Sequence, residues 1–250
     1  MRTHTALGIL ALLVVVGVIV FYAASRPTPV RAPVPSSYSE HTQYYDITAQ
    51  LATSTPLLQS AGVKADAVAV TLMKNFVSET IVQFKTDGNF ANLTSEDIQT
   101  LGLDQGRKET LQINHVIASG AHTVSYIYTI YTDTLGAHGN TYYRTFTFNL
   151  EDGEPLLLSD LFVKDSPYLE TLSVQGRSML PDIIGVDMYD ENMAKAGTEP
   201  ETINFENFFL DDISLVILFP PYAVAAYAAG PQTLAIPTSE LKDILKPEFQ

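Results

Sequence analysis

The chain contains no cysteine among its 250 residues. Disulfide bonds and thiolate metal sites are therefore excluded, because both need cysteine sulfur. A lipoprotein anchor is excluded for the same reason, since it is attached to a cysteine at the processing site.

Basic residues are scarce: 14 lysines and arginines stand against 28 acidic residues, giving a formal charge of −14. Arg2, Arg26 and Arg31 lie in or beside the N-terminal segment, and every acidic residue follows residue 37. Residues 38–250 therefore carry 11 basic and 28 acidic side chains, a net charge of −17. This sign argues against nucleic acid as a partner, because such binding is driven by basic surface. It suits simple solubility and would also favour a cationic partner.

Motifs for common catalysis and metal binding are also lacking. The chain has no G-x-S-x-G, P-loop or dinucleotide fingerprint, and no H-E-x-x-H or EF-hand spacing. His115 and His122 flank Gly120 without a recognised ligand spacing, and an acidic group is more simply a solvated face: Asp182, Asp187, Asp190 and Glu191. We expect no metal, no cofactor and no enzymatic activity. A carboxylate pair that meets only in space, suited to glycoside hydrolysis, stays open.

One long apolar run, Ala6 to Ala24, has the length of a bilayer-spanning helix. A cleaved signal peptide is the alternative, with a fair small-residue site at Ala23-Ala24-Ser25. We favour an uncleaved signal anchor over residues 1–25, membrane-embedded through residues 6–24. The flanking charges favour neither orientation strongly. The short N-terminal tail and the large acidic remainder place the bulk of this single-pass chain outside the cytoplasm. Residues 26–37 hold four prolines and form a semi-rigid linker.

Hydrophobic periodicity predicts the elements of the first half. Residues 44–53 form a strand, and residues 61–85 form a helix that ends before Gly88. A short helix starts near Thr94. Three strands follow at 110–117, 123–131 and 141–150, in which apolar residues alternate with serine and threonine. Such alternation is typical of antiparallel strands buried on one face.

The second half mixes helices with short strands. We expect a strand at 156–158, helices at 166–180 (ending near Pro181) and 187–195, and a last strand at 233–236 before a short terminal helix. Residues 213–219 are apolar except for Ser214, which predicts a strand buried on both faces. The fold class is α+β, an antiparallel sheet packed with helices. We divide the ectodomain into an N-terminal part, 38–105, and a C-terminal part, 106–250.

Two blocks of sequence resemble a bacterial extracytoplasmic domain of unknown function. The first block has the pattern P-Y-x-x-A-x-Y-A-x-G and then a strand ending I-P: Pro221, Tyr222, Ala225, Tyr227, Ala228, Gly230, Ile236 and Pro237. The second is G-A-H-G-N at 136–140, followed by F-x-F-x-L and an L-S-D-L-F run at 158–162. This domain is found in lysozyme-sensing anti-sigma factors of the RsiV type and ahead of the catalytic domain of PdaC-type peptidoglycan deacetylases.

The resemblance implies a binding module for a lysozyme-like basic protein or for peptidoglycan itself. We expect neither anti-sigma activity nor deacetylation from this chain, since only about five residues precede the apolar run and no deacetylase domain follows the module. An undescribed cell-wall hydrolase and a deacetylase-associated accessory domain are the alternatives.

The two blocks supply the candidate partner-binding residues: Pro221, Tyr222, Tyr227, Gly230, His138 and Asn140. Tyrosines on a proline-stiffened loop are favoured interface anchors. The structural alternatives are that the tyrosines pack over the end of the sheet, and that the 136–140 loop needs its glycines for backbone shape.

Overall fold

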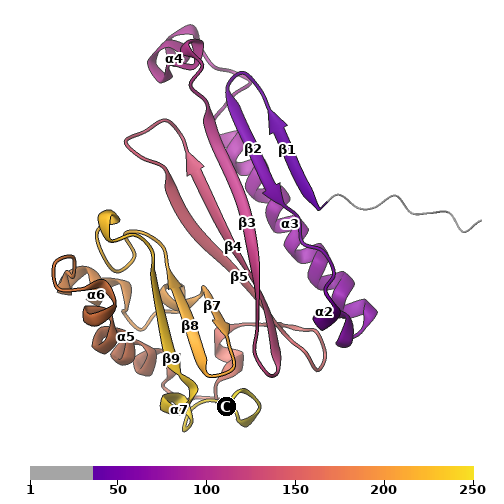
Figure 1. Ribbon diagram of the computed structural model, residues 1–250, viewed down its shortest axis with the longest axis vertical. Coiled ribbons are helices and arrows are strands. Elements are labelled where there is room, and N and C mark those ends of the chain that lie inside the picture. Colours follow the sequence, from indigo (N-terminus) through magenta and orange to yellow (C-terminus); the bar gives the residue numbers. More distant parts are fainter. Residues whose placement is uncertain (1–35) are drawn as a thin grey trace, which may run out of the picture. The chain divides into compact units, whose positions relative to one another are not determined.

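The computed structural model describes residues 36–250. The predicted membrane span at 6–24 and nearly all of the predicted linker lie outside these residues. Between residues 36 and 250, no helix combines the length and the apolar character needed to cross a membrane. Two sheets are present within this range, with helices packed against them (Figure 1). This confirms an α+β fold.

The larger sheet has the strand order β1-β2-β3-β4-β5-β6. Its members are β1 (Ser37–His41), β2 (Tyr45–Gln50), β3 (Glu109–Ser119), β4 (Thr123–Asp133), β5 (Asn140–Asn149) and β6 (Pro155–Leu156). The predicted strands at 44–53, 110–117, 123–131 and 141–150 are thus confirmed, whereas β1 was not predicted. All pairs are antiparallel except β2–β3, so the expectation of a purely antiparallel sheet is wrong. The long connection from β2 to β3 returns the chain to the end at which β2 began, which makes this pair parallel.

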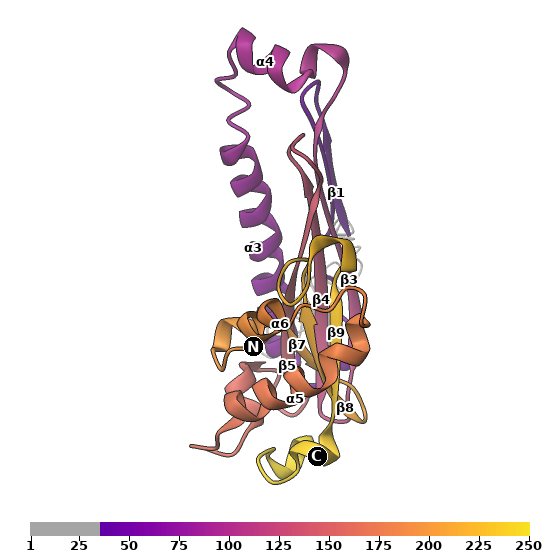
Figure 2. The same cartoon turned by 90° about the vertical axis from the view of Figure 1, so that its left-hand side faces the viewer.

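That connection carries α2 (Pro56–Ser60), α3 (Val63–Asp87) and α4 (Ser95–Leu101). Helix α3 runs along one face of the six-stranded sheet (Figure 2). Its buried face meets the sheet's apolar face in the first core, contributing Ala69, Met73, Val77, Ile81 and Phe84. The predicted helix at 61–85 is confirmed, with a break at Gly62 that separates α2 from α3. Thr94 and Asp97 form the capping box that begins α4.

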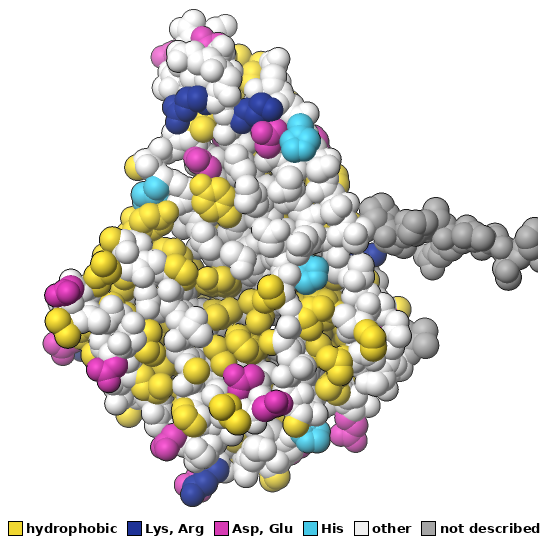
Figure 3. All heavy atoms as spheres, viewed as in Figure 1, with side chains coloured by type: hydrophobic (Ala, Val, Ile, Leu, Met, Phe, Trp, Pro, Cys, Tyr) yellow, Lys and Arg dark blue, Asp and Glu magenta, His cyan; other side chains and the backbone are white. Residues whose placement is uncertain are grey.

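The smaller sheet has the order β7-β8-β9 and is antiparallel: β7 (Phe208–Leu210), β8 (Ser214–Phe219) and β9 (Gln232–Pro237). Around it lie α5 (Tyr168–Ile184), α6 (Glu191–Gly197) and α7 (Thr238–Leu241). These elements share a second core. Every residue of β8 is buried except the half-buried Leu218, as predicted, while Ile213 lies outside the strand and is 72% exposed. Hydrophobic side chains also gather on the surface of this half (Figure 3).

Short 3-10 turns connect these elements: Leu103–Gln105, Leu158–Leu161, Thr202–Phe205, Tyr227–Ala229 and Pro247–Phe249. Helix α5 continues through Pro181 to Ile184, so the predicted end near Pro181 is wrong. A proline removes one helical hydrogen bond, but Ile184 packs against the second core and Gly185, at φ +82°, ends the helix. Helix α6 begins after its N-cap Asp190, later than the predicted residue 187.

The second sheet covers the polar face of β4 and β5. Strand β7 packs across both strands. The Phe208 amide donates to Thr145 Oγ1 at 3.0 Å, and Thr147 Oγ1 donates to the Phe208 carbonyl at 3.2 Å. Ser125, Thr145 and Thr147 are therefore buried, not solvent-facing as their alternation predicted. Short hydroxyl side chains suit this place, because Thr145 and Thr147 bond to the backbone of β7 while allowing a close approach. Ser125 Oγ lies 2.9 Å from Thr147 Oγ1.

Candidate functional site

The two loops singled out in the sequence meet in the structure. One joins β4 to β5 and carries residues 134–139, and the other joins β8 to β9 and carries residues 220–231. The imidazole of His138 stacks on the ring of Tyr227, with centroids 3.9 Å apart and planes inclined by 23°. The Tyr222 and Tyr227 centroids are 5.4 Å apart. We call His138, Tyr222 and Tyr227 the aromatic cluster.

Hydrogen bonds orient the side chains of the aromatic cluster. The Gly139 carbonyl accepts a bond from the Tyr227 hydroxyl at 2.9 Å and lies 2.9 Å from His138 Nδ1. A carbonyl oxygen only accepts, so Nδ1 carries a proton. In the neutral ring Nε2 then accepts from the Tyr222 hydroxyl, 3.1 Å away. The polar atoms of all three side chains thus bond within the two loops.

Tyr222 occupies a strained backbone position. The Ala223 amide donates to the Pro220 carbonyl at 3.1 Å, which closes a four-residue turn with Pro221 second and Tyr222 third. Tyr222 has φ +72°. Type II turns need a positive φ at the third position, where glycine is usual. A tyrosine there costs conformational energy, as is common for residues at functional sites, and it is 53% exposed.

Two close approaches hold the loops in place. A Cβ on Gly139 would overlap the hydroxyl of Tyr131, and a Cβ on Gly197 at the end of α6 would overlap the carbonyl of Ala223. Position 197 therefore needs glycine because it faces backbone, whereas a side chain at residue 139 would displace the Tyr131 ring. The sequence analysis did not name Tyr131 or Gly197, because the contacts that make them matter lie between residues distant in the chain.

The other predicted site residues do not join the stack. Pro221 shapes the turn, and Gly230 ends the 3-10 turn of Tyr227–Ala229 with φ +70°. Asn140 is the exposed first residue of β5 and pairs with Thr132. A role in binding for these three residues stays a prediction.

The two histidines beside Gly120 lie in different surroundings. His115 lies on β3 against the rings of Tyr126 and Tyr128, and burial lowers the pKa of its imidazole. His122 is exposed in the β3–β4 turn. Among residues 36–250, no group of histidine and acidic side chains is arranged to hold a metal ion. Asp190 of the acidic group caps α6 by accepting from the Met193 amide at 2.9 Å.

The ring nitrogens of His138 bond to a backbone carbonyl and a tyrosine hydroxyl. In the part of the chain that the structure describes, neither ring nitrogen of His138 bonds to a carboxylate. Such a partner is what orients a histidine for proton transfer in many active sites. What the cluster offers instead is exposed aromatic surface on two interlocked loops.

Comparison with known proteins identifies part of the chain. Residues 159–239 match the family model DUF3298, described as a protein of unknown function. The chain carries a DUF3298 domain. It contains α5, α6 and the three-stranded sheet, and with them Tyr222 and Tyr227, while His138 lies outside the matched residues. The aromatic cluster therefore joins the DUF3298 domain to the six-stranded sheet.

Solved structures of DUF3298 family members share the fold over more than the matched residues. One from Bacteroides fragilis aligns with a TM-score of 0.58 and 16% identity, over 85% of this chain and 92% of that one. One from Pseudomonas aeruginosa aligns with a TM-score of 0.53 and 15% identity, over 87% of this chain and 97% of that one. At these identities the likeness shows the fold alone.

A curated relative is the peptidoglycan-N-acetylmuramic acid deacetylase PdaC of Bacillus subtilis. It is 32% identical over 144 residues, which are 57% of this chain and 31% of the relative. The chain thus spans about a third of the length of PdaC. The predicted resemblance is confirmed: the chain has a DUF3298 domain and is related to PdaC.

Proposed function

We propose that this chain is a membrane-anchored binding module of the bacterial cell envelope that contacts peptidoglycan through the aromatic cluster. The module acts by binding, not by catalysis, and residues 6–24 hold it at the outer face of the cell membrane. The cluster of His138, Tyr222 and Tyr227 carries the proposal, because two loops distant in the sequence are built around it.

The chemistry of the cluster suits a sugar polymer. Aromatic rings present an apolar face with polar tips, which matches the mixed surface of a pyranose ring. Because the polar atoms of the cluster already bond to one another and to Gly139, the ring faces are held in position before a ligand arrives. Less ordering entropy is then lost on binding.

The relative supports the choice of peptidoglycan. PdaC is named for its action on N-acetylmuramic acid, a sugar of the wall. The part of PdaC that this chain matches is a minority of its length, so a non-catalytic role in bringing a protein to the wall fits this shared part.

A basic muramidase such as lysozyme is the second candidate ligand. The charge of −17 on residues 38–250 favours it, because opposite charges accelerate association. On the face shown in Figure 3, however, the acidic side chains are dispersed and form no large continuous patch. We therefore place peptidoglycan first.

Sedimentation with insoluble peptidoglycan tests the proposal. The full chain, kept in a mild non-ionic detergent because of its predicted span, should pellet with purified peptidoglycan. The double substitution Tyr222→Ala/Tyr227→Ala should weaken the binding at least about tenfold, since tyrosine is enriched among the hot-spot residues whose removal costs about 2 kcal/mol or more. Val186→Ala is the matched control, because Val186 is a 90% exposed apolar residue of the same domain outside the cluster.

Retention of full binding by the folded double variant would contradict the proposal. Calorimetric titration with hen lysozyme distinguishes the second candidate: salt-sensitive binding that the double variant loses, with no pelleting, would move the assignment to the muramidase. Release of soluble fragments from the peptidoglycan would instead show an enzyme.

A further inference from the structure

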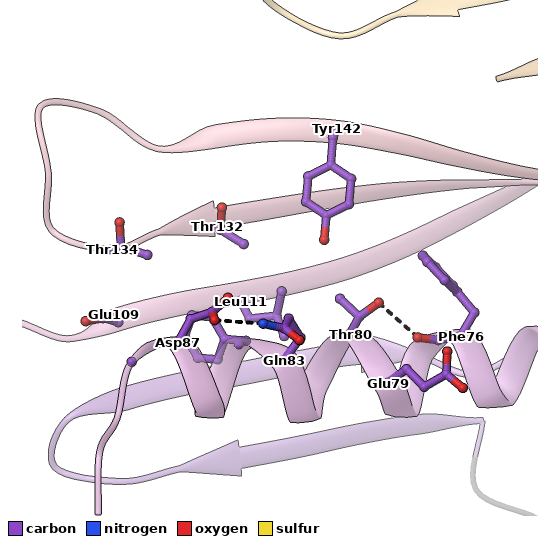
Figure 4. A pocket seen from close by; sticks show the side chains of 12 residues that line it. Phe76, Glu79, Thr80, Gln83, Asp87, Glu109, Leu111, Thr132, Thr134 and Tyr142 are labelled. Atoms are coloured by element: carbon purple, nitrogen blue, oxygen red, sulfur yellow. Dashed lines mark hydrogen bonds between the residues drawn. The ribbon is translucent and has the colours of Figure 1, made fainter. Parts of the chain in front are cut away.

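A groove separate from the aromatic cluster lies between α3 and the six-stranded sheet. It has a volume of about 710 Å³ and is bordered by the C-terminal half of α3 and by β3, β4 and β5 (Figure 4). This volume is within the range of small-molecule sites. Tyr142 reaches from β5 toward the helix, and Glu79, Gln83 and Asp87 follow one another along α3 (Figure 4).

The polar lining has one sign of charge. Three carboxylates border the groove, those of Glu79, Asp87 and Glu109, and no lysine, arginine or histidine does. Threonine and tyrosine hydroxyls supply most of the other polar atoms, and Phe76 and Leu111 supply apolar surface. A ligand with several hydroxyls, an apolar face and a positive charge would match this lining.

Glu109 distinguishes the groove from an ordinary acidic surface. It is only 5% exposed, at the start of β3. Among residues 36–250 no hydrogen-bond donor and no basic side chain is paired with its carboxylate, although most buried carboxyl groups have such partners. Burial, and then the nearby charge of Asp133, raise the pKa of Glu109. Asp133 itself accepts from the Leu135 amide at 2.8 Å.

The other two carboxylates of the groove have a hydrogen-bond donor or contact with solvent. Asp87 accepts from Gln83 Nε2 at 2.7 Å, a bond visible in Figure 4. Glu79 is exposed on the outer side of the groove. Glu109 is therefore the most buried of the three carboxylates, it has no hydrogen-bond donor among the described residues, and it lines the groove from the β3 side.

We infer that this groove binds an amino sugar, whose ammonium group pairs with Glu109 and whose hydroxyls meet the threonine and tyrosine hydroxyls of the wall. The pyranose face packs against the apolar side chains of the groove. The site is distinct from the aromatic cluster, and it relies on the proposed function only for the cell wall as the source of the sugar.

Titration with two oligosaccharides tests the inference. The probes are the glucosamine tetramer and its fully N-acetylated form, which differ in charge at nitrogen, added to the full chain at physiological salt. The glucosamine tetramer should bind at least about tenfold more tightly. Glu109→Gln keeps the shape of the side chain and should remove most of this preference. Glu79→Gln, at the exposed border, should reduce it less.

A matched control separates the groove from general acidity. Asp182→Asn/Asp187→Asn removes two charges from exposed positions outside the groove and should leave the affinity for the glucosamine tetramer unchanged. Equal affinity for the two tetramers, or an unchanged affinity in Glu109→Gln, would overturn the inference. Binding of pentalysine as tight as that of the glucosamine tetramer would also overturn it, in favour of a cationic peptide.

The two proposals fail separately. Tyr222→Ala/Tyr227→Ala should still bind the glucosamine tetramer, and Glu109→Gln should still pellet with acetylated peptidoglycan. Loss of pelleting in both variants would show a general loss of structure, which circular dichroism of each variant detects.

Discussion

Tyr222 holds a backbone conformation that its own side chain disfavours. Its φ of +72° places the residue in the left-handed region, where a side chain costs about 1–2 kcal/mol relative to glycine. This conformation allows the hydrogen bond between the Tyr222 hydroxyl and His138 Nε2. The strained turn therefore lowers the stability of the fold but directs the Tyr222 ring toward the neighbouring loop.

Two substitutions of Tyr222 separate the effect of backbone strain from the effect of losing the ring contacts. Tyr222→Ala and Tyr222→Gly remove the same ring contacts, but only glycine relieves the strained φ. We predict that Tyr222→Gly is more stable than Tyr222→Ala by about 1 kcal/mol, measured by urea denaturation. An alanine variant as stable as the glycine variant would show that the turn is not strained.

At this scale the sequence showed which residues mattered but not how they meet. Resemblance to a known domain selected His138, Tyr222 and Tyr227, and the structure places them in one cluster. Nothing in the sequence predicted that Gly139 would serve both loops as a hydrogen-bond acceptor, because that contact joins residues 88 positions apart.

The packing of β7 on β5 connects the two sheets. Thr145 Oγ1 accepts a buried hydrogen bond from the Phe208 amide. Both sheets are held in register at this point by side-chain hydroxyls, which replace the water that would otherwise solvate the backbone of β7.

Thr145→Val should therefore destabilise the fold. Valine keeps the shape but leaves the Phe208 amide without a partner, which costs about 1–3 kcal/mol of unfolding free energy. Thr141→Val on the same strand, where the hydroxyl has no such bond, should change it by less than about 0.5 kcal/mol. Equal effects of the two substitutions in urea denaturation would refute the role of Thr145.

The elements themselves were largely predictable. The alternation of apolar and polar residues identified β3, β4 and β5. The helical spacing of apolar residues identified α3. The same alternation gave the wrong environment for Ser125, Thr145 and Thr147, because it records polarity and not what covers a face. The parallel β2–β3 pair depends on the path of the connection, which local periodicity does not encode.

For the chain as a whole, charge and surface chemistry are compatible with the proposed binding role in the cell envelope. Residues 38–250 carry a net charge of −17, which argues against nucleic acid as a partner. Two candidate contact regions of different chemistry lie in the described residues. The amino-acid composition alone indicated the acidic net charge. The groove beside α3 was not predictable, since it arises from the separation between a helix and a sheet that are each ordinary in sequence.

The central claim is that the aromatic cluster contacts the wall, and the NMR signals of the histidine rings test it most directly. The chain has five histidines, so their ring signals are few enough to assign. On addition of soluble peptidoglycan fragments, the account predicts that the His138 signal shifts or broadens while those of His41 and His122 stay unchanged. Binding of the fragments with no change at His138 would contradict the account.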